Sequence, residues 1–338
     1  MGRSLVRARK RGRRPSSVVS PAWQRWVAVN LLRGTTTDDL VQGLIDAGVS
    51  ESLATATVTA VSTSAGLGVA REHQRRSRRR GLVARLCGEI ESTPLVVERG
   101  PAPGAAEFFA RYWEASRPAI FTDVVPRWHA KWTPQLLRER YGDVPIEACQ
   151  GREGDPRPDA NWQKYRVTMT LAEYVDRMAE VDEGNDLYLI ANNRNTARPQ
   201  MRSLWDDVVL PDGWFAKSRL ATGSALWLGP GGTVTPLHHD TSNILLCQIH
   251  GRKRIVLAPP WDLNLLETAD GVYNQRTVEQ AEQAGAQTIA MTLEAGEALF
   301  IPVGWWHDVR AVDPSVSLAI NAFARANVFE WYRPGSVR

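Results

Sequence analysis

Short apolar runs bounded by glycine and proline recur through the last third of the chain. They cover residues 225–229, 244–249, 253–258, 297–302 and 316–323. Runs of this kind are typical of buried β-strands. A series of short strands separated by turn residues predicts a mainly β domain with added helices. Its core would be a double-stranded β-helix, the jelly-roll architecture of cupins.

Apolar residues spaced by three and four positions precede these strands. This spacing predicts helices over residues 105–113, 133–141 and 170–178, which we expect to flank the β core. Residues 118–122 are expected to form one further strand. Residues 150–163 are rich in Gly, Asp, Pro and Asn, and we expect a loop that borders the mouth of the β core.

The amino-terminal part of the chain predicts a small helical region over residues 21–95. Thr36 is followed by two aspartates, a pattern that favours a capped helix start, and Gly48 is expected to end that helix. The larger domain would then cover residues 96–338. Packing of the helical region as a cap on the β core is the favoured interpretation. Binding of a leader peptide or partner, and homodimer formation, are alternatives.

Charge is unevenly distributed along the 338 residues. The net charge is +4 and the pI is about 9.1, yet residues 3–14 alone carry seven basic groups and no acid. We expect residues 1–20 to form a basic disordered tail. Nucleic-acid binding is not expected, although basic segments also attract acidic surfaces. A second basic run at residues 75–80 has no interleaved aromatic residues.

The cysteine pattern indicates a reducing environment. The chain has three cysteines, Cys87, Cys149 and Cys247, far apart in sequence. They form neither a disulfide framework nor a CxxC metal motif, so we expect a cytoplasmic protein. No apolar run is long enough to span a membrane and no secretory signal is visible, so no membrane association is expected.

The most informative motif is Thr-Pro-Leu-His-His-Asp at residues 235–240. Side chains two positions apart on a β-strand point to the same face, so His238 and Asp240 can reach one metal while His239 points away. A distant histidine, His307, follows a Pro-Val-Gly-Trp-Trp segment. Two histidines and a carboxylate are the ligands of the facial triad that holds non-haem Fe(II). A buried structural His–Asp pair is the alternative.

These segments resemble a known family. The sequence Gln-Ile-His-Gly-Arg-Lys-Arg-Ile-Val-Leu-Ala-Pro-Pro at 248–260 and the sequence around Tyr188 add to the resemblance. Together they are similar to the cupin-like JmjC family of Fe(II)/2-oxoglutarate-dependent oxygenases over residues 97–330. The motifs are similar to those of the family's asparaginyl hydroxylase that inhibits hypoxia-inducible factor.

The resemblance implies a set of site residues. His238, Asp240 and His307 would bind Fe(II). Lys253 would pair with the distal carboxylate of 2-oxoglutarate, with Thr235 and Tyr188 as hydroxyl donors to the same carboxylate. A solvated strand lysine, a turn threonine and a half-buried tyrosine are the corresponding structural alternatives.

Two departures from the family pattern concern asparagines. Family members often carry Asn four positions after the ligand aspartate and fifteen after the distal histidine. This chain has Ile244 and Ala322 at those positions, with Asn243 and Asn321 one residue earlier. An offset of one residue on a strand turns a side chain to the opposite face, unless a bulge restores it. Asn243 and Asn321 are therefore candidate 2-oxoglutarate contacts that depend on local geometry.

Two adjacent tryptophans, Trp305 and Trp306, precede the distal histidine in a chain with thirteen tryptophans. One of them is a candidate wall of the metal pocket, although tryptophan is more often buried in a core. The other histidines, His73, His129, His239 and His250, are treated as structural or surface residues.

The resemblance implies a dioxygenase that uses Fe(II), 2-oxoglutarate and O₂. Such an enzyme couples decarboxylation of 2-oxoglutarate to hydroxylation of a substrate C–H bond, expected here on an amino-acid side chain of a protein or peptide. Fold-level resemblance alone does not establish the substrate. N-methyl demethylation and hydroxylation of a free amino acid use the same chemistry and stay open. A metal-binding cupin without oxygenase activity is the alternative from another class.

Overall fold

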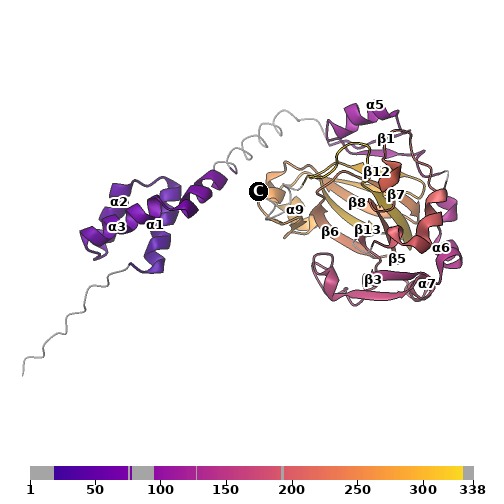
Figure 1. The fold of residues 1–338 in the computed structure, drawn as a ribbon, viewed down its shortest axis with the longest axis horizontal. Helices are drawn as coiled ribbons and strands as arrows, with labels where there is room; N and C mark the ends of the chain where they lie inside the picture. The colour runs from indigo at the N-terminus through magenta and orange to yellow at the C-terminus, as the bar shows by residue number, and fades with distance from the viewer. Residues whose placement is uncertain (1–18, 75–76, 78–94, 127, 192–193, 330–338) are drawn as a thin grey trace, which may run out of the picture. The chain divides into compact units, whose positions relative to one another are not determined.

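The computed structural model describes residues 19–74, 77, 95–126, 128–191 and 194–329. The chain divides into two compact units, residues 1–86 and residues 87–338, and each has an apolar core of its own (Figure 1). Residues 1–18 of the predicted basic tail and most of the second basic run lie outside the described residues.

The amino-terminal unit contains three helices within the region that the sequence predicts to be helical. They are α1 (Pro21–Arg33), α2 (Thr37–Asp46) and α3 (Glu51–Ser62). The Thr36 hydroxyl accepts the Asp39 backbone N–H at the start of α2, as the cap pattern predicts. The buried side chains of this unit form one cluster: Val27, Leu31, Leu40, Leu44, Ala54, Val58 and Leu67.

None of the described helices is by itself long and apolar enough to cross a membrane. The helix pair Glu51–Ser62 and Ala65–Gln74, bent by 55° at its break, passes that test of length and composition only when its two parts are combined.

The larger unit is a sandwich of two six-stranded sheets (Figure 1). The first sheet contains, in spatial order, β1 (Glu98–Gly100), β2 (Ala119–Phe121), β12 (Ala298–Ile301), β7 (Ile244–His250), β14 (Ser315–Ile320) and β5 (Ser224–Gly229). The second sheet contains β11 (Ile289–Leu293), β8 (Lys253–Ala258), β13 (Trp306–Ala311), β6 (Val234–His239), β10 (Tyr273–Asn274) and β9 (Ala269–Asp270). All neighbouring strands are antiparallel except β1 and β2.

The chain passes repeatedly from one sheet to the other. From β5 to β8, successive strands belong alternately to the first and the second sheet, and β12 to β14 repeat this alternation. This connectivity gives the double-stranded β-helix expected from the sequence. Apolar side chains from both sheets meet between them, including Leu246 and Leu299 from the first sheet and Ile255 and Leu257 from the second.

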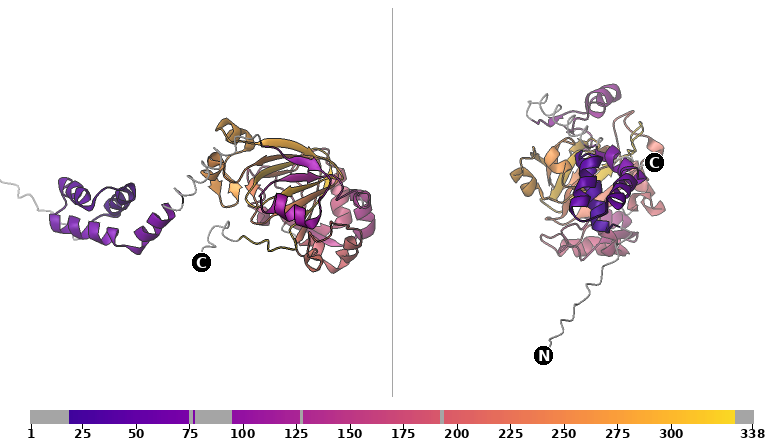
Figure 2. Two further views of the ribbon diagram at one scale, coloured as in Figure 1. Left: turned by 90° about the horizontal axis from the view of Figure 1, so that it is seen from above. Right: turned by 90° about the vertical axis from the view of Figure 1, so that its left-hand side faces the viewer.

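Helices cover the outer faces of the sandwich (Figure 2). On the first sheet lie α5 (Ala105–Phe108), which continues as a π-helix over Phe109–Trp113, α6 (Pro134–Tyr141) and α7 (Leu171–Ala179). The short helices α8 (Leu263–Leu266) and α9 (Val278–Gln283) pack on the second sheet. The predicted flanking helices are thereby confirmed.

A two-stranded sheet of β3 (Pro145–Cys149) and β4 (Arg166–Thr170) was not expected from the sequence. The predicted loop of residues 150–163 lies between these two strands in the sequence. Short 3₁₀-helices complete the described secondary structure, at His129–Lys131, Trp162–Lys164, Asn195–Ala197, Pro199–Asp206 and Lys217–Arg219.

Candidate metal centre

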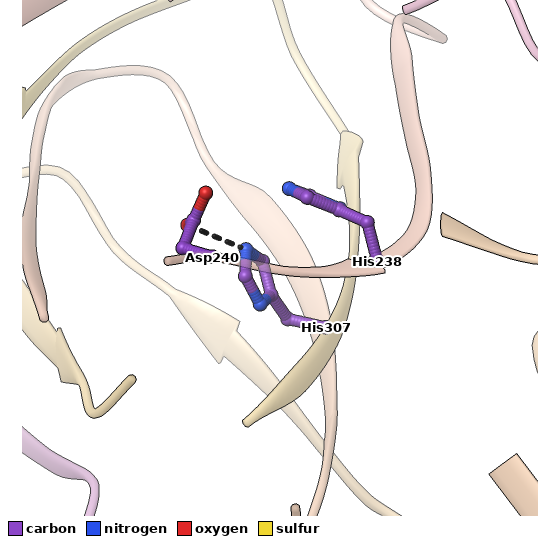
Figure 3. Close-up of side chains that lie close together, drawn as sticks. All are labelled: His238, Asp240 and His307. Carbon is purple, nitrogen blue, oxygen red and sulfur yellow. Dashed lines mark ion pairs between the residues drawn. The ribbon is translucent and has the colours of Figure 1, made fainter. Parts of the chain in front are cut away.

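Two neighbouring strands of the second sheet bring the predicted metal ligands together. His238 is near the end of β6 and Asp240 directly follows that strand. His307 is on β13, where its Cα pairs with that of His238. One ligand atom from each of the three residues lies within 4.8 Å of the other two, and the side chains converge on one point (Figure 3). Strand alternation and register therefore produce the triad.

Backbone carbonyls fix the two imidazole rings. The Nδ1 atom of His238 lies 2.8 Å from the Pro236 carbonyl oxygen, and that of His307 lies 2.9 Å from the Trp305 carbonyl oxygen. A carbonyl only accepts, so each Nδ1 carries a hydrogen and each Nε2 is the ring atom directed toward the metal position. This orientation is typical of metal-binding histidines. The His307 Nε2 atom lies 3.3 Å from Asp240 Oδ2.

The electrostatic state of the triad suits a divalent cation. Burial lowers the pKa of His238 to about 4, so this ring is neutral at physiological pH. Burial alone would raise the pKa of Asp240, but the hydrogen bond and charge of His307 outweigh it and lower that pKa. Two imidazole nitrogens and one carboxylate are the donor set of non-haem Fe(II) sites. The residues present therefore fit the metal.

The neighbours of the triad are structural. His239 does not belong to the ligand group, and its ring packs edge-on against Trp306 with 4.8 Å between ring centroids. Trp306 is part of a core cluster on the outer side of the second sheet. The Trp305 indole N–H donates to the Ser116 carbonyl at 2.9 Å. Neither tryptophan lines the cavity, so the interpretation of one of them as a pocket wall is wrong.

A cavity of about 1130 Å³ opens beside the triad and extends between the two sheets. Lys253, at the start of β8, lines it and is 2% exposed. Its ammonium donates to the Tyr188 hydroxyl at 3.2 Å. Among the described residues, no carboxylate forms an ion pair with Lys253. A buried cation without an anionic partner is costly, so this arrangement favours an anionic ligand.

Thr235 reaches the same cavity through a bulge. It lies three positions before His238, so simple alternation would put the two side chains on opposite faces. His307 pairs with His238 and Val309 pairs with Thr235, so three steps along β6 match two along β13. The extra residue resets the alternation. Both side chains line the cavity as a result.

Asn243 does not face the cavity. Its side-chain oxygen accepts the Val303 N–H and its amide group donates to Asn327 Oδ1, so the side chain is used within the protein. Ile244 lines the cavity instead. The expectation that Asn243 contacts 2-oxoglutarate is therefore wrong, because its side chain bonds the Val303 N–H and the Asn327 side chain instead.

Asn321 directly follows β14 and lines the cavity near its exposed edge. Ala319 lies on the same side, whereas Ala322 belongs to the core cluster on the other side of the strand. A contact between Asn321 and 2-oxoglutarate stays a prediction, as do those of Lys253, Tyr188 and Thr235.

The structure adds cavity residues that the sequence did not single out. Asp159, from the loop between β3 and β4, is 6% exposed and pairs with the fully buried Arg152. Tyr273, on β10, stacks on the His238 ring with 5.8 Å between centroids. A loop aspartate and a tyrosine in a two-residue strand carry no periodic signal. Only the expectation that residues 150–163 border the mouth pointed to this region.

A comparison with protein families gives a match to the larger unit. The model of the cupin-like domain matches residues 105–327, two thirds of the chain. This match includes all three triad residues. The chain belongs to the cupin-like JmjC family. JmjC demethylases use Fe(II), 2-oxoglutarate and O₂, and the His238–Asp240–His307 triad could hold the iron.

Several curated JmjC proteins are similar in sequence. Jumonji C domain-containing protein 5 of Drosophila melanogaster is 29% identical over 239 residues, covering 64% of this chain and 57% of that protein. Lysine-specific demethylase 8 of Xenopus tropicalis is 29% identical over 237 residues, covering 64% and 50%. Lysine-specific demethylase JMJ30 of Arabidopsis thaliana is 28% identical over 239 residues, covering 66% and 54%. The chain spans about half the length of these relatives.

Proposed function

We propose that this protein is an Fe(II)- and 2-oxoglutarate-dependent hydroxylase of an amino-acid side chain in a protein or peptide. The observation that carries the proposal is the buried Lys253 ammonium in the same cavity as the triad. The triad alone fits many metal reactions, but a buried cation beside it calls for an anionic co-substrate. Family membership points to the same chemistry.

The cavity residues would have the following roles. His238, Asp240 and His307 would hold the metal. Lys253 and the Tyr188 hydroxyl would bind the distal carboxylate of 2-oxoglutarate and orient the molecule. When bound, Fe(II) supplies O₂ activation, which couples decarboxylation of 2-oxoglutarate to insertion of oxygen into a C–H bond. The apolar side chains Leu246, Ile301 and Val309 line the same cavity and limit access of water.

Demethylation of an N-methyl group is the second candidate, because several relatives bear the name lysine-specific demethylase. Hydroxylation of a methyl group on nitrogen gives an unstable product that releases formaldehyde. The same iron chemistry therefore supports both outcomes. A free amino acid as substrate is a further alternative for which the cavity offers no specific support.

Product analysis separates these candidates. The full chain is incubated with Fe(II), 2-oxoglutarate, ascorbate, O₂ and a mixture of unmodified and N-methylated peptides. The proposal predicts peptides that gain one oxygen atom, detected by mass spectrometry, without formaldehyde. Loss of methyl groups with release of formaldehyde would instead establish the demethylase. Oxidation of free amino acids alone would contradict a peptide substrate.

A further inference from the structure

Asp240 is the triad residue that lies outside the paired strands. His238 and His307 lie within β6 and β13 and pair with each other across the sheet. Asp240 lies one residue beyond the end of β6, in the connection of residues 240–243 that leads to β7. Tight metal binding requires that every ligand be held in its productive position. Contacts outside the β ladder must therefore fix this connection.

A buried asparagine far along the chain holds the connection. The side-chain oxygen of Asn327 accepts the Asn243 N–H at 2.8 Å, and its amide group donates to the Asn243 carbonyl at 2.8 Å. The Asn327 side chain thus pairs with both backbone groups of Asn243, as a residue of a neighbouring strand would. The Phe329 N–H donates to the Thr241 carbonyl at 3.1 Å. Residues 324–329, here called the carboxy-terminal strap, therefore hold the connection at two points.

The same hydrogen-bond network reaches the segment that carries the second histidine ligand. The Asn243 side-chain amide donates to Asn327 Oδ1 at 2.9 Å, and its side-chain oxygen accepts the Val303 N–H at 2.9 Å. Val303 lies in the turn between β12 and β13, shortly before His307. The adjacent Gly304 N–H donates to the carbonyl of the first residue of the connection at 3.3 Å. The two ligand-bearing segments are therefore joined to each other beyond the end of the β ladder.

The hydrogen-bonding capacity of Asn327 is fully used within the protein. Its side-chain oxygen accepts twice from Asn243, and its amide group donates to the carbonyls of Asn243 and Asn321. Asn327 is 6% exposed and does not line the cavity, whereas Thr241 and Ser242 of the connection do. Any effect of Asn327 on the metal centre would therefore act through the connection.

We propose that Asn327 is a positioning residue of the metal centre. It fixes the connection so that the Asp240 carboxylate and the two histidine nitrogens are directed at one point. Without its side chain the carboxylate would occupy a wider range of positions, and the affinity for the metal would fall. The inference rests on the proposed function, because it concerns the metal of that same site.

Binding of Co(II) tests the inference without turnover. Imidazole and carboxylate ligands bind Co(II) as they bind Fe(II), and the visible absorption of Co(II) reports the geometry of its ligands. The full chain is titrated with Co(II) alone, with calorimetry for the affinity and absorption spectroscopy for the geometry. Asn327→Ala should weaken Co(II) binding about 10- to 100-fold, the range for residues that orient metal ligands. Its Co(II) spectrum should differ from that of the wild type.

Asn195→Ala is the matched control. Asn195 is a buried asparagine whose side chain accepts the Glu147 N–H at 3.0 Å and donates to the Glu147 carbonyl at 2.9 Å, so it holds a backbone segment in the same way. Glu147 lies on β3, which carries none of the triad residues. Urea denaturation should show that both variants fold with reduced stability. Only Asn327→Ala should lose Co(II) affinity, a difference that a purely structural role would not produce.

A second pair of variants preserves the volume of the side chain, in case the alanine variant does not fold. Asn327→Asp and Asn195→Asp each keep an acceptor for the backbone N–H, but a carboxylate cannot donate to the backbone carbonyl. The cost of introducing a buried carboxylate is similar at the two positions. Weaker Co(II) binding in Asn327→Asp than in Asn195→Asp is the expected result.

The outcomes separate the positioning role from the proposed function. Wild-type Co(II) affinity and spectrum in the Asn327 variants would overturn the positioning role, as would equal losses of affinity in the Asn327 and Asn195 variants. Either result leaves the proposed function standing. Failure of the wild type to bind Co(II), or unchanged binding in Asp240→Ala, would contradict the metal centre of the proposed function and, with it, this inference.

Discussion

Lys253 and Arg254 are neighbours on β8 but face opposite sides of the sheet, one buried in the cavity and the other exposed. If Lys253 pairs with a carboxylate of 2-oxoglutarate, Lys253→Met should weaken binding of 2-oxoglutarate about 10- to 100-fold, the loss expected for a charged hydrogen bond. Arg254→Met should leave that affinity within about twofold. Calorimetry on the Mn(II)-loaded protein measures both. Equal affinities for the two variants would remove Lys253 from the site.

Asn243 is predicted to act on stability and not on co-substrate binding. Asn243→Ala would leave the half-buried Val303 N–H without its acceptor and would remove one of the two hydrogen bonds that Asn327 Oδ1 accepts. We expect a loss of about 1–3 kcal/mol in the free energy of unfolding, measured by urea denaturation. The affinity for 2-oxoglutarate should change little. Full stability together with weakened 2-oxoglutarate binding would show that Asn243 has the role assigned by the family pattern.

The alternation of side chains along a strand explains which residues of the site could be predicted from the sequence. His238 and Asp240 stand two apart on an unbroken stretch, so their shared face was predictable. Thr235 required a bulge that pairing alone reveals. Asn327 required knowledge of which backbone groups its side chain bonds. Such facts depend on long-range packing, which local periodicity does not encode.

At the scale of elements, α7 holds the segment that carries Tyr188. The Tyr174 hydroxyl donates to the Leu228 carbonyl on β5 and accepts the Leu189 N–H. Tyr174→Phe should lower the free energy of unfolding by about 1–3 kcal/mol, because two buried backbone groups lose a partner. It should also weaken 2-oxoglutarate binding through displacement of Tyr188. Urea denaturation and calorimetry measure the two effects. Unchanged values for both would show that α7 does not position this segment.

The long periodic elements were predictable, and the short ones were not. The flanking helices and the main strands carry clear apolar spacing, and their existence is confirmed. The paired strands β3 and β4 were missed because residues 145–149 and 166–170 are short and partly exposed. β9 and β10, two residues each, have no pattern at all. Their pairing comes from tertiary contacts.

At the scale of the whole molecule, acid should destabilise the larger unit through paired aspartates. Burial alone would raise the pKa of Asp207, but hydrogen bonds from Arg140, Lys131 and Trp132 outweigh it and hold that pKa below its usual range. A lowered folded-state pKa contributes stability that is present above the unfolded-state value and is lost as the pH falls below it. The free energy of unfolding should therefore fall below about pH 4.

Asp207→Asn should make that decline shallower, measured as unfolding free energy against pH. Asp212→Asn, at an exposed position of the same segment, should leave the slope unchanged. An unchanged slope in Asp207→Asn would show that this carboxylate does not contribute to acid unfolding.

Packing of the helical unit as a cap on the β core, the cytoplasmic location and a homodimer stay predictions, because the described contacts bear on none of them. The central claim concerns the β sandwich, where His238, Asp240, His307 and Lys253 share one cavity.

The most direct test of that claim is the formation of succinate from 2-oxoglutarate by the purified full chain with Fe(II), ascorbate, O₂ and a peptide mixture. The account predicts succinate formation that stops when a chelator removes the metal and that is lost in Asp240→Ala. No succinate from the wild type, or equal amounts from Asp240→Ala, would contradict it.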